Sequence, residues 1–243
     1  MKRAKFLFDK IVDYENIRLA WLKARKGKTK KPVVQKFALN VNENLLQVQK
    51  NLKSNPPVLS QYVQFKIFDP KERIISVVPF TDRVMHHAIM NVLEEVFERQ
   101  FIFHTYACRK NKGTHRAVKY AFSKAKTSKY FLKLDVKKYF DNINHAVLKN
   151  QLERIIKDKD CLNLLFSIID SYGLSGKGKG LPIGNLTSQF FANFYLSVLD
   201  HFVLENLKKR HKRSLINREF SLGLINEEKY CERIKCMFAI SSV

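Results

Sequence analysis

The sequence predicts an α/β fold that is rich in helix, and three observations carry this prediction. The chain has 243 residues, of which 45% are hydrophobic and 12% aromatic. This is enough to bury a substantial core in one large domain or two small ones. Several segments repeat apolar residues at helical spacing, and three shorter segments alternate apolar and polar residues as strands do.

Residues 1–60 are predicted to be helical. The stretch NIRLAWLKARKG ends on Gly27, and NENLLQVQKNLK runs into a pair of prolines. A basic stretch at 23–32, KARKGKTKKP, joins the two helices as a loop. The segments QYVQFKIFD and IISVVPF then alternate on either side of a polar turn, which predicts a β-hairpin.

A core-facing helix is expected next, with Thr81 or Asp82 as its N-cap and a row of valine and alanine residues from 84 to 96 along one face. His86 and His87 lie in this helix and are expected to pack or cap rather than to bind a ligand. Arg83 is expected either to anchor the helix to an acidic neighbour or to contact the nucleic-acid backbone. A polar, basic loop at 104–116 follows, and a further helix begins near residue 116.

A third strand is predicted at 131–136, FLKLDV. Its period of two places Leu132, Leu134 and Val136 on one face and Asp135 on the other. Helix is expected from 145 to 172, with a break near residues 158–160, and a glycine-rich turn follows. The long apolar helix after it contains Asn193 and Asp200, so it is not expected to span a membrane.

The charge of the chain predicts a polyanionic partner. There are 45 Lys and Arg residues against 22 Asp and Glu, a net charge of +23. Nucleic acid is the leading partner and an anionic membrane surface is second, while a solvated basic face with no ligand remains the alternative. No signal peptide or membrane-length apolar run is visible, and the four cysteines form no CxxC pair, so a cytoplasmic protein with free thiols is expected.

Asp135 is the first candidate for chemistry. A carboxylate held at a strand end suits Mg²⁺, which prefers hard oxygen ligands. An exposed aspartate with no function is the alternative for this residue taken alone.

Four motifs in order resemble those of reverse transcriptases. FLKLDVKKYFDNINHAVL and, some forty residues later, GLPIGNLTSQFFANFYLSVLD are similar to the two central palm motifs. Upstream, FKIFDPKERIISVVPFTDRVMHHAI and FIFHTYACRKNKGTHRAV resemble finger motifs of the bacterial group II intron-like enzymes. The form IGNLTSQ is similar to reverse transcriptases of diversity-generating retroelements, a subfamily associated with error-prone copying of RNA.

The resemblance implies a right-hand polymerase fold with fingers at 1–130, a partial palm at 131–205 and a divergent tail at 206–243 without a thumb. It implies an RNA-directed DNA polymerase by descent, which binds an RNA template and primer and uses dNTPs and Mg²⁺. The sequence leaves open whether there is an accessory protein.

The resemblance also implies roles for single residues. Asp135 and the main-chain carbonyl of Val136 match metal ligands, and Phe140 matches the aromatic residue that excludes a 2′-hydroxyl. The expected nucleotide-binding residues are Arg73, Arg109, Phe140, Ile183, Gly184 and Gln189. The expected nucleic-acid-binding residues are Arg25, Lys26, Lys28, Lys30, Lys31 and Lys112. For Arg73, Arg109 and Lys112 a solvated surface charge is the alternative, and for Phe140 the alternative is an aromatic residue of the core.

One departure from the family pattern changes the expected activity. The family carries a Tyr-x-Asp-Asp motif, but this chain contains no Asp-Asp pair, and Cys236 and Met237 stand where the two acids belong. Soft sulfur ligands do not replace carboxylates around Mg²⁺, so impaired catalysis is expected. A decayed or frameshifted copy is the favoured explanation, and a non-catalytic RNA-binding module is the alternative.

Overall fold

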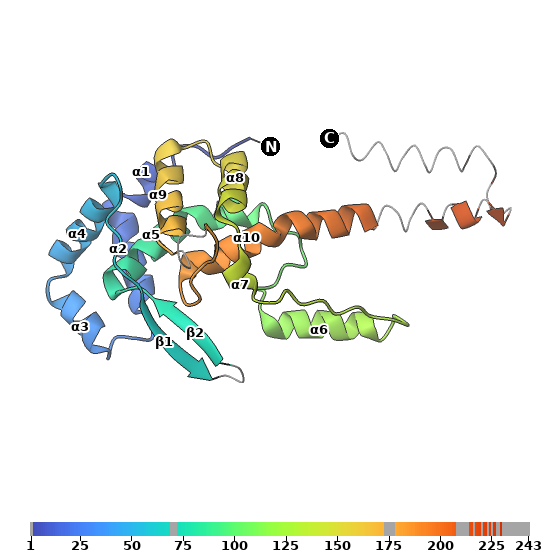
Figure 1. The fold of residues 1–243 in the computed structure, drawn as a ribbon, viewed down its shortest axis with the longest axis horizontal. Coiled ribbons are helices and arrows are strands. Elements are labelled where there is room, and N and C mark those ends of the chain that lie inside the picture. Colours follow the sequence, from blue (N-terminus) through green and yellow to red (C-terminus); the bar gives the residue numbers. More distant parts are fainter. Residues whose placement is uncertain are drawn as a thin grey trace. The chain divides into compact units, whose positions relative to one another are not determined.

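A computed structural model describes residues 2–68, 72–172 and 178–207, with scattered residues between 214 and 229. The chain separates into two compact units, residues 1–195 and 196–243. Figure 1 labels the α-helices and the two strands. These are α1 (Phe8–Ile11), α2 (Tyr14–Arg25), α3 (Pro32–Leu39), α4 (Val41–Lys53), β1 (Val63–Phe68), β2 (Glu72–Val77), α5 (Phe80–Glu98), α6 (Thr114–Ala125), α7 (Tyr139–Asn142), α8 (His145–Ile155), α9 (Lys159–Asp170) and α10 (Leu186–Phe202). A short π-helix, Val203–Leu207, follows α10. The predicted α/β, helix-rich character is confirmed.

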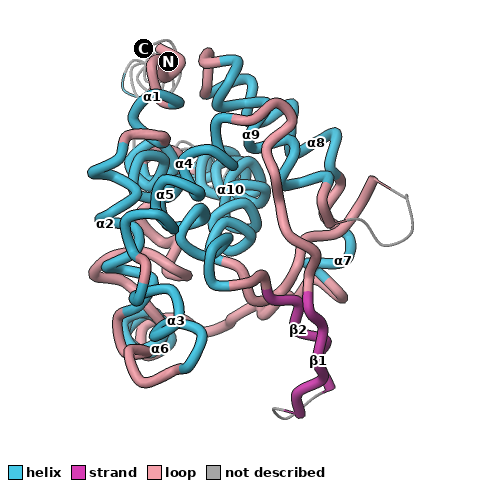
Figure 2. Tube along the Cα trace, turned by 90° about the vertical axis from the view of Figure 1, so that its left-hand side faces the viewer, coloured by secondary structure: helices cyan, strands magenta, loops and turns pink. Residues whose placement is uncertain are grey.

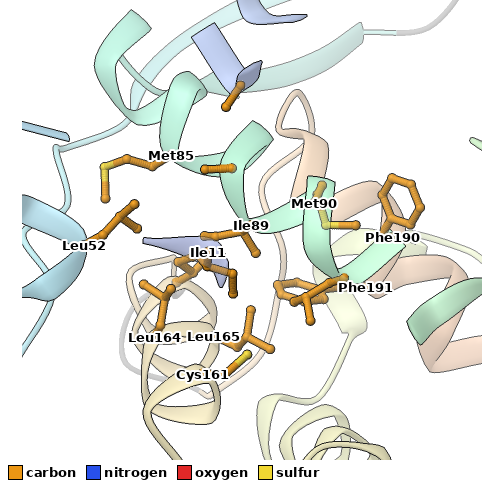
Figure 3. Close-up of a cluster of buried hydrophobic side chains, with 14 of the residues drawn as sticks. Ile11, Leu52, Met85, Ile89, Met90, Cys161, Leu164, Leu165, Phe190 and Phe191 are labelled. Carbon is orange, nitrogen blue, oxygen red and sulfur yellow. The ribbon is translucent and has the colours of Figure 1, made fainter. Parts of the chain in front are cut away.

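Helix α5 is the centre of the first unit. It packs against α1, α2, α3 and α4, and ten of its nineteen residues are buried. In Figure 3, side chains from α1, α4, α5, α9 and α10 point toward one another in one hydrophobic cluster, which includes Ile11, Leu52, Met85, Ile89, Leu165 and Phe191. In the predicted row from 84 to 96, the first two residues, Val84 and Ala88, are fully buried in the core.

Strands β1 and β2 form the predicted hairpin. They pair antiparallel, with Val63 opposite Val77 and Phe68 opposite Glu72. Figure 2 shows the pair extending away from the helices that surround its base. Its tip, residues 69–71, lies outside the described residues.

The strand predicted at 131–136 does not form. The segment has no regular secondary structure, and the leucines expected to face the core, Leu132 and Leu134, are each 82% exposed. A strand needs a hydrogen-bonded neighbour to be stable, and within the described part of the chain β1 and β2 pair only with each other. The alternating pattern alone was therefore not sufficient to make a strand here.

Two local predictions about helices were also wrong. Helix α5 begins at Phe80, with Pro79 at the N-cap position and no side-chain cap. The buried carboxylate of Asp82 instead accepts hydrogen bonds from the backbone and hydroxyl of Ser60, at 2.7 and 2.9 Å. The predicted loop at 23–32 is also shorter, since α3 begins at Pro32. Proline is favoured in the first turn of a helix because its missing N–H would have no partner there.

The break predicted near residue 158 is confirmed, and it also holds the N-terminal segment. Asp158 caps α9 by accepting a hydrogen bond from the amide of Cys161. Its other carboxylate oxygen accepts from the amides of Leu7 and Phe8, at 2.7 and 2.9 Å. An isolated bridge between Ala4 and Ile156 adds two backbone hydrogen bonds. One side chain therefore joins α1 to the start of α9.

No helix in the described residues has both the length and the apolar composition that crossing a membrane requires. The residues Cys236 and Met237 lie outside the described residues.

Candidate nucleic-acid interface

A pocket of about 320 Å³ lies where the end of α2, strand β2, helix α5 and the turn before α10 meet. Three residues predicted from the sequence, Lys28, Gly184 and Gln189, line it together. Its polar lining consists of Lys28, Arg83, His86, His87, Asn185 and Gln189. We call these six residues the basic pocket.

The apolar wall of this pocket is built by a close contact between the hairpin and Gly184. The amide of Ser76 donates a hydrogen bond to the carbonyl of Ile183, with N···O 2.9 Å. Gly184 has φ +125°, and a Cβ there would lie 3.0 Å from Cγ2 of Ile75 and 3.1 Å from the carbonyl oxygen of Ser76. The position therefore requires glycine, for its backbone angle and for space.

The pocket is strongly positive. Burial first, and then the charges of Arg83 and Lys31, lower the pKa of Lys28 below its ordinary value. Burial, followed by the charges of Lys28 and Lys23, likewise lowers the pKa of His87. No carboxylate is among the described residues that line the pocket. Such uncompensated charge is typical of a site for an anion.

His86 is a buried residue of the pocket lining. It is 5% exposed, and its Nδ1 lies 2.8 Å from the hydroxyl of Thr187 in α10. Burial, and then the neighbouring His87, lower the pKa of His86 to about 4, so the ring is neutral at pH 7. The expected packing role of His86 is confirmed. His87 is half-buried, and both rings line the pocket.

Arg109 is held within its own neighbourhood. Its Nε and Nη2 donate to the carboxylate of Glu98, at 2.9 and 2.8 Å, and its Nη1 donates to the carbonyls of Ile102 and Thr105. Its side chain is only 11% exposed. In this structure Arg109 fastens the loop after α5 to that helix, and the expected contact with a nucleotide triphosphate would require it to leave these partners.

The other predicted basic residues differ in how they are held. Arg25 stacks on Trp21, with its Cζ 4.3 Å from the ring centroid. Lys112 lies 3.5 Å over the ring of Phe103 and donates to the Phe103 carbonyl at 2.7 Å. The remaining ones, Arg73, Lys26, Lys30 and Lys31, are exposed on β2 and on the loop between α2 and α3.

The predicted metal ligands do not come together. Asp135 is exposed on the irregular segment before α7, and Val136 is 49% exposed beside it. Asp141, the nearest further carboxylate in sequence, lies in α7 and is exposed. Among the described residues no group of three or more His, Cys, Asp or Glu could hold a metal ion. These donors therefore do not fit the Mg²⁺ site that the family resemblance implies.

Phe140 is half-buried and packs against the core. Its ring meets that of Tyr139 edge-on at 5.8 Å, and its carbonyl accepts a hydrogen bond from Leu181. The expected contact with a nucleotide sugar stays a prediction.

His87 and Asn185 were not identified as site residues from the sequence, and for Arg83 the sequence left open an acidic neighbour or the nucleic-acid backbone as its partner. Arg83 lies in the first turns of α5, where its Nε donates to the carbonyl of Val78 at 3.2 Å. Asn185 precedes α10 and is 3% exposed. The one available signal was their position in the finger and palm motifs, because their meeting with Lys28 depends on the folded chain.

Comparisons with known proteins agree with the motifs. A family model described as "Reverse transcriptase (RNA-dependent DNA polymerase)" matches residues 67–216. The Group II intron-encoded protein LtrA of Lactococcus lactis subsp. cremoris is 27% identical over 212 residues, which cover 83% of this chain and 34% of that protein. The Putative COX1/OXI3 intron 1 protein of Saccharomyces cerevisiae is 25% identical over 165 residues, or 63% of this chain and 20% of that protein.

A solved structure titled "Partial Cas6-RT-Cas1--Cas2 complex" is similar with a TM-score of 0.48 and 23% sequence identity, over 81% of this chain and 34% of that chain. The chain thus spans about a third or less of the length of the first curated relatives that it matches.

Proposed function

Since the chain belongs to the reverse transcriptase family, we propose that it binds an RNA template and its primer. The family match over residues 67–216 is the observation that carries the proposal. The net charge of +23 supports it, because a surplus of Lys and Arg supplies the phosphate contacts on which sequence-independent binding depends. The cytoplasm is the proposed compartment, from the expected free thiols.

The reaction of this lineage is addition of a dNTP to a primer 3′ end with Mg²⁺. We propose that this reaction is impaired in the present chain. Asp135 is an exposed carboxylate on an unpaired segment, and the chain contains no Asp-Asp pair. One carboxylate is insufficient to hold two closely spaced divalent ions against their mutual repulsion.

A non-catalytic RNA-binding module is the second candidate function, and the same exposed position of Asp135 favours it. We propose the same boundaries for both candidates, with fingers at 1–130, a partial palm at 131–205 and a tail at 206–243. The closer similarity to diversity-generating retroelements rests on the motif IGNLTSQ alone, and reduced nucleotide selectivity at Ile183 remains part of the proposal.

Two assays on the same preparation separate these functions. Filter binding with a labelled RNA template and primer should give salt-sensitive affinity. Primer extension with dNTPs and either Mg²⁺ or Mn²⁺ should give no product above background. Robust cDNA synthesis that Asp135→Ala abolishes would show that the chain is an active polymerase. Absence of RNA binding at low salt would reject both functions.

A further inference from the structure

The basic pocket contains donors that the protein itself leaves unused. Nζ of Lys28 and the terminal nitrogens of Arg83 make no hydrogen bond to any described residue, while Nε of Arg83 is held by Val78. Asn185 is 3% exposed and its Nδ2 has no hydrogen-bond partner of good geometry among the described residues, although its amide lies near enough to influence the Tyr62 hydroxyl. A buried donor without a partner, as at Asn185, is costly. Lys28 and Arg83 are partly buried, and their charged donors also have no partner among the described residues. Together these donors indicate a ligand or ordered water.

The shape and charge of the pocket restrict that ligand. A volume of about 320 Å³ exceeds that of a single water, which occupies about 30 Å³ in the liquid. The lining combines an ammonium, a guanidinium and an imidazole with no described carboxylate. Charge-assisted hydrogen bonds from such donors are strongest to a phosphate or carboxylate. In a chain that binds nucleic acid, phosphate is the ligand of that class.

We propose that the basic pocket binds a phosphate group between Lys28, Arg83 and His87, and that His87 takes up a proton when the phosphate binds. This inference rests on the proposed RNA-binding function and assigns it a specific, pH-dependent contact. The phosphate could come from the RNA backbone or from a nucleotide triphosphate, and the chemistry of recognition is the same for both.

The proton uptake follows from the charges that face His87. These are Lys23 on α2, Lys28 on the following loop, and Arg83 and His86 on its own helix, whereas the α10 side contributes the neutral Asn185 and Gln189. Burial, and then the charges of Lys28 and Lys23, disfavour the imidazolium form of His87. A bound phosphate reverses the local field, so it favours the charged form. Affinity must then rise as pH falls.

The test uses the full chain and two probes, a fluorescein-labelled single-stranded RNA and inorganic tripolyphosphate as its competitor. Lys28→Gln should weaken RNA binding roughly 10-fold, as expected for one charge-assisted hydrogen bond. Lys50→Gln, which removes an exposed lysine of α4 outside the pocket, should change affinity by less than about twofold. Equal losses in the two variants would overturn the pocket assignment.

The pH dependence of RNA affinity tests the role of His87 separately. Wild-type affinity should increase several-fold from pH 8 to pH 6, within the limit of tenfold per pH unit for one linked proton. His87→Gln should bind as wild type does at pH 8 and lose this increase. An unchanged pH dependence in His87→Gln would overturn the proton uptake. Thermal unfolding of each variant shows whether a loss of affinity reflects a loss of folding.

The arms also separate this inference from the proposed function. If tripolyphosphate displaces labelled RNA from the wild type but not from Lys28→Gln, a triphosphate-like source is supported. If only unlabelled RNA competes, the backbone is the source. Binding of RNA with no difference between Lys28→Gln and Lys50→Gln rejects the pocket alone. Binding of tripolyphosphate in a direct calorimetric titration, without any RNA binding, rejects the proposed function while the pocket stands.

Discussion

The amide of Ser76 in β2 donates a hydrogen bond to the carbonyl of Ile183, 107 positions later in the chain, with N···O 2.9 Å. This bond seats Gly184 against the side chains of Ile75 and Val77. The base of the hairpin and the turn before α10 therefore form one structural piece, which is the wall of the basic pocket.

Gly184→Ala should destabilise the protein by roughly 2–4 kcal/mol, from backbone strain at φ +125° and from contacts that force Ile75 or the Ser76 carbonyl to move. Gly27→Ala is the matched control, because Gly27 also has positive φ, +70°, but a Cβ there would meet nothing within 4 Å. Urea unfolding of both variants measures the difference. Equal destabilisation would mean that the contact with the hairpin contributes nothing.

The loop between α2 and α3 should account for part of the salt dependence of RNA binding. The slope of log K against log salt should become less steep by up to about 3 when the lysines of the loop are changed to alanine. Each phosphate contact with a single strand contributes roughly 0.7 to the steepness of that slope. The residues to change are Lys26, Lys28, Lys30 and Lys31. A control with equal charge loss changes Lys50, Lys53, Lys157 and Lys159, which are exposed on or near α4 and α9. The loop is not part of the interface if both sets flatten the slope equally.

The buried His86 should make folding sensitive to acid. Its pKa is about 4 in the folded protein against 6.5 for an ordinary histidine, so between these values the unfolded chain binds a proton that the folded chain does not. Stability should fall as pH decreases from 6.5 to 4, by up to about 3 kcal/mol. His86→Leu should remove this part of the pH dependence while Thr187→Val retains it. Chemical denaturation at pH 7 and at pH 4.5 measures the effect.

Arg109 should matter for stability in the absence of any nucleotide. Arg109→Lys should cost roughly 1.5–3 kcal/mol, because lysine lacks the planar fork that bonds Glu98 and two carbonyls together. A double-mutant cycle with Glu98→Gln measures the coupling between the two side chains. If unfolding of Arg109→Lys matches that of the wild type, the residue is free to serve the nucleotide, as the motif predicts.

Local signals in the sequence were sufficient for much of the fold. The ends of α2 and α4, the hairpin and the break at Asp158 depend on residues close in sequence, such as Gly27 and the Pro-Pro pair. The segment at 131–136 has an equally clear alternation, but a strand also needs a neighbour from elsewhere in the chain. The same limit applies to Asp82, whose partner Ser60 is 22 positions away.

The sequence identified several residues of the candidate site but did not predict which residues meet there. The motifs identified Gly184 and Gln189, and the charge identified Lys28, yet nothing in the sequence brings Lys28 to Arg83 and His87. Arg109 shows the opposite case. Its motif predicts a contact with a ligand, whereas in this structure its guanidinium forms an ion pair with Glu98.

The attachment of α1 to Asp158 has a consequence for synthesis on the ribosome. The amide of Leu7 emerges 151 positions before the carboxylate that binds it. At about 5–20 residues per second, the nascent chain waits roughly 8–30 s before this contact can form. Until then Ile11, which is fully buried in the finished protein, has no completed core to enter. We therefore expect the contacts of α1 with α2 and α5 to form first, and its attachment to the start of α9 to be completed late in synthesis.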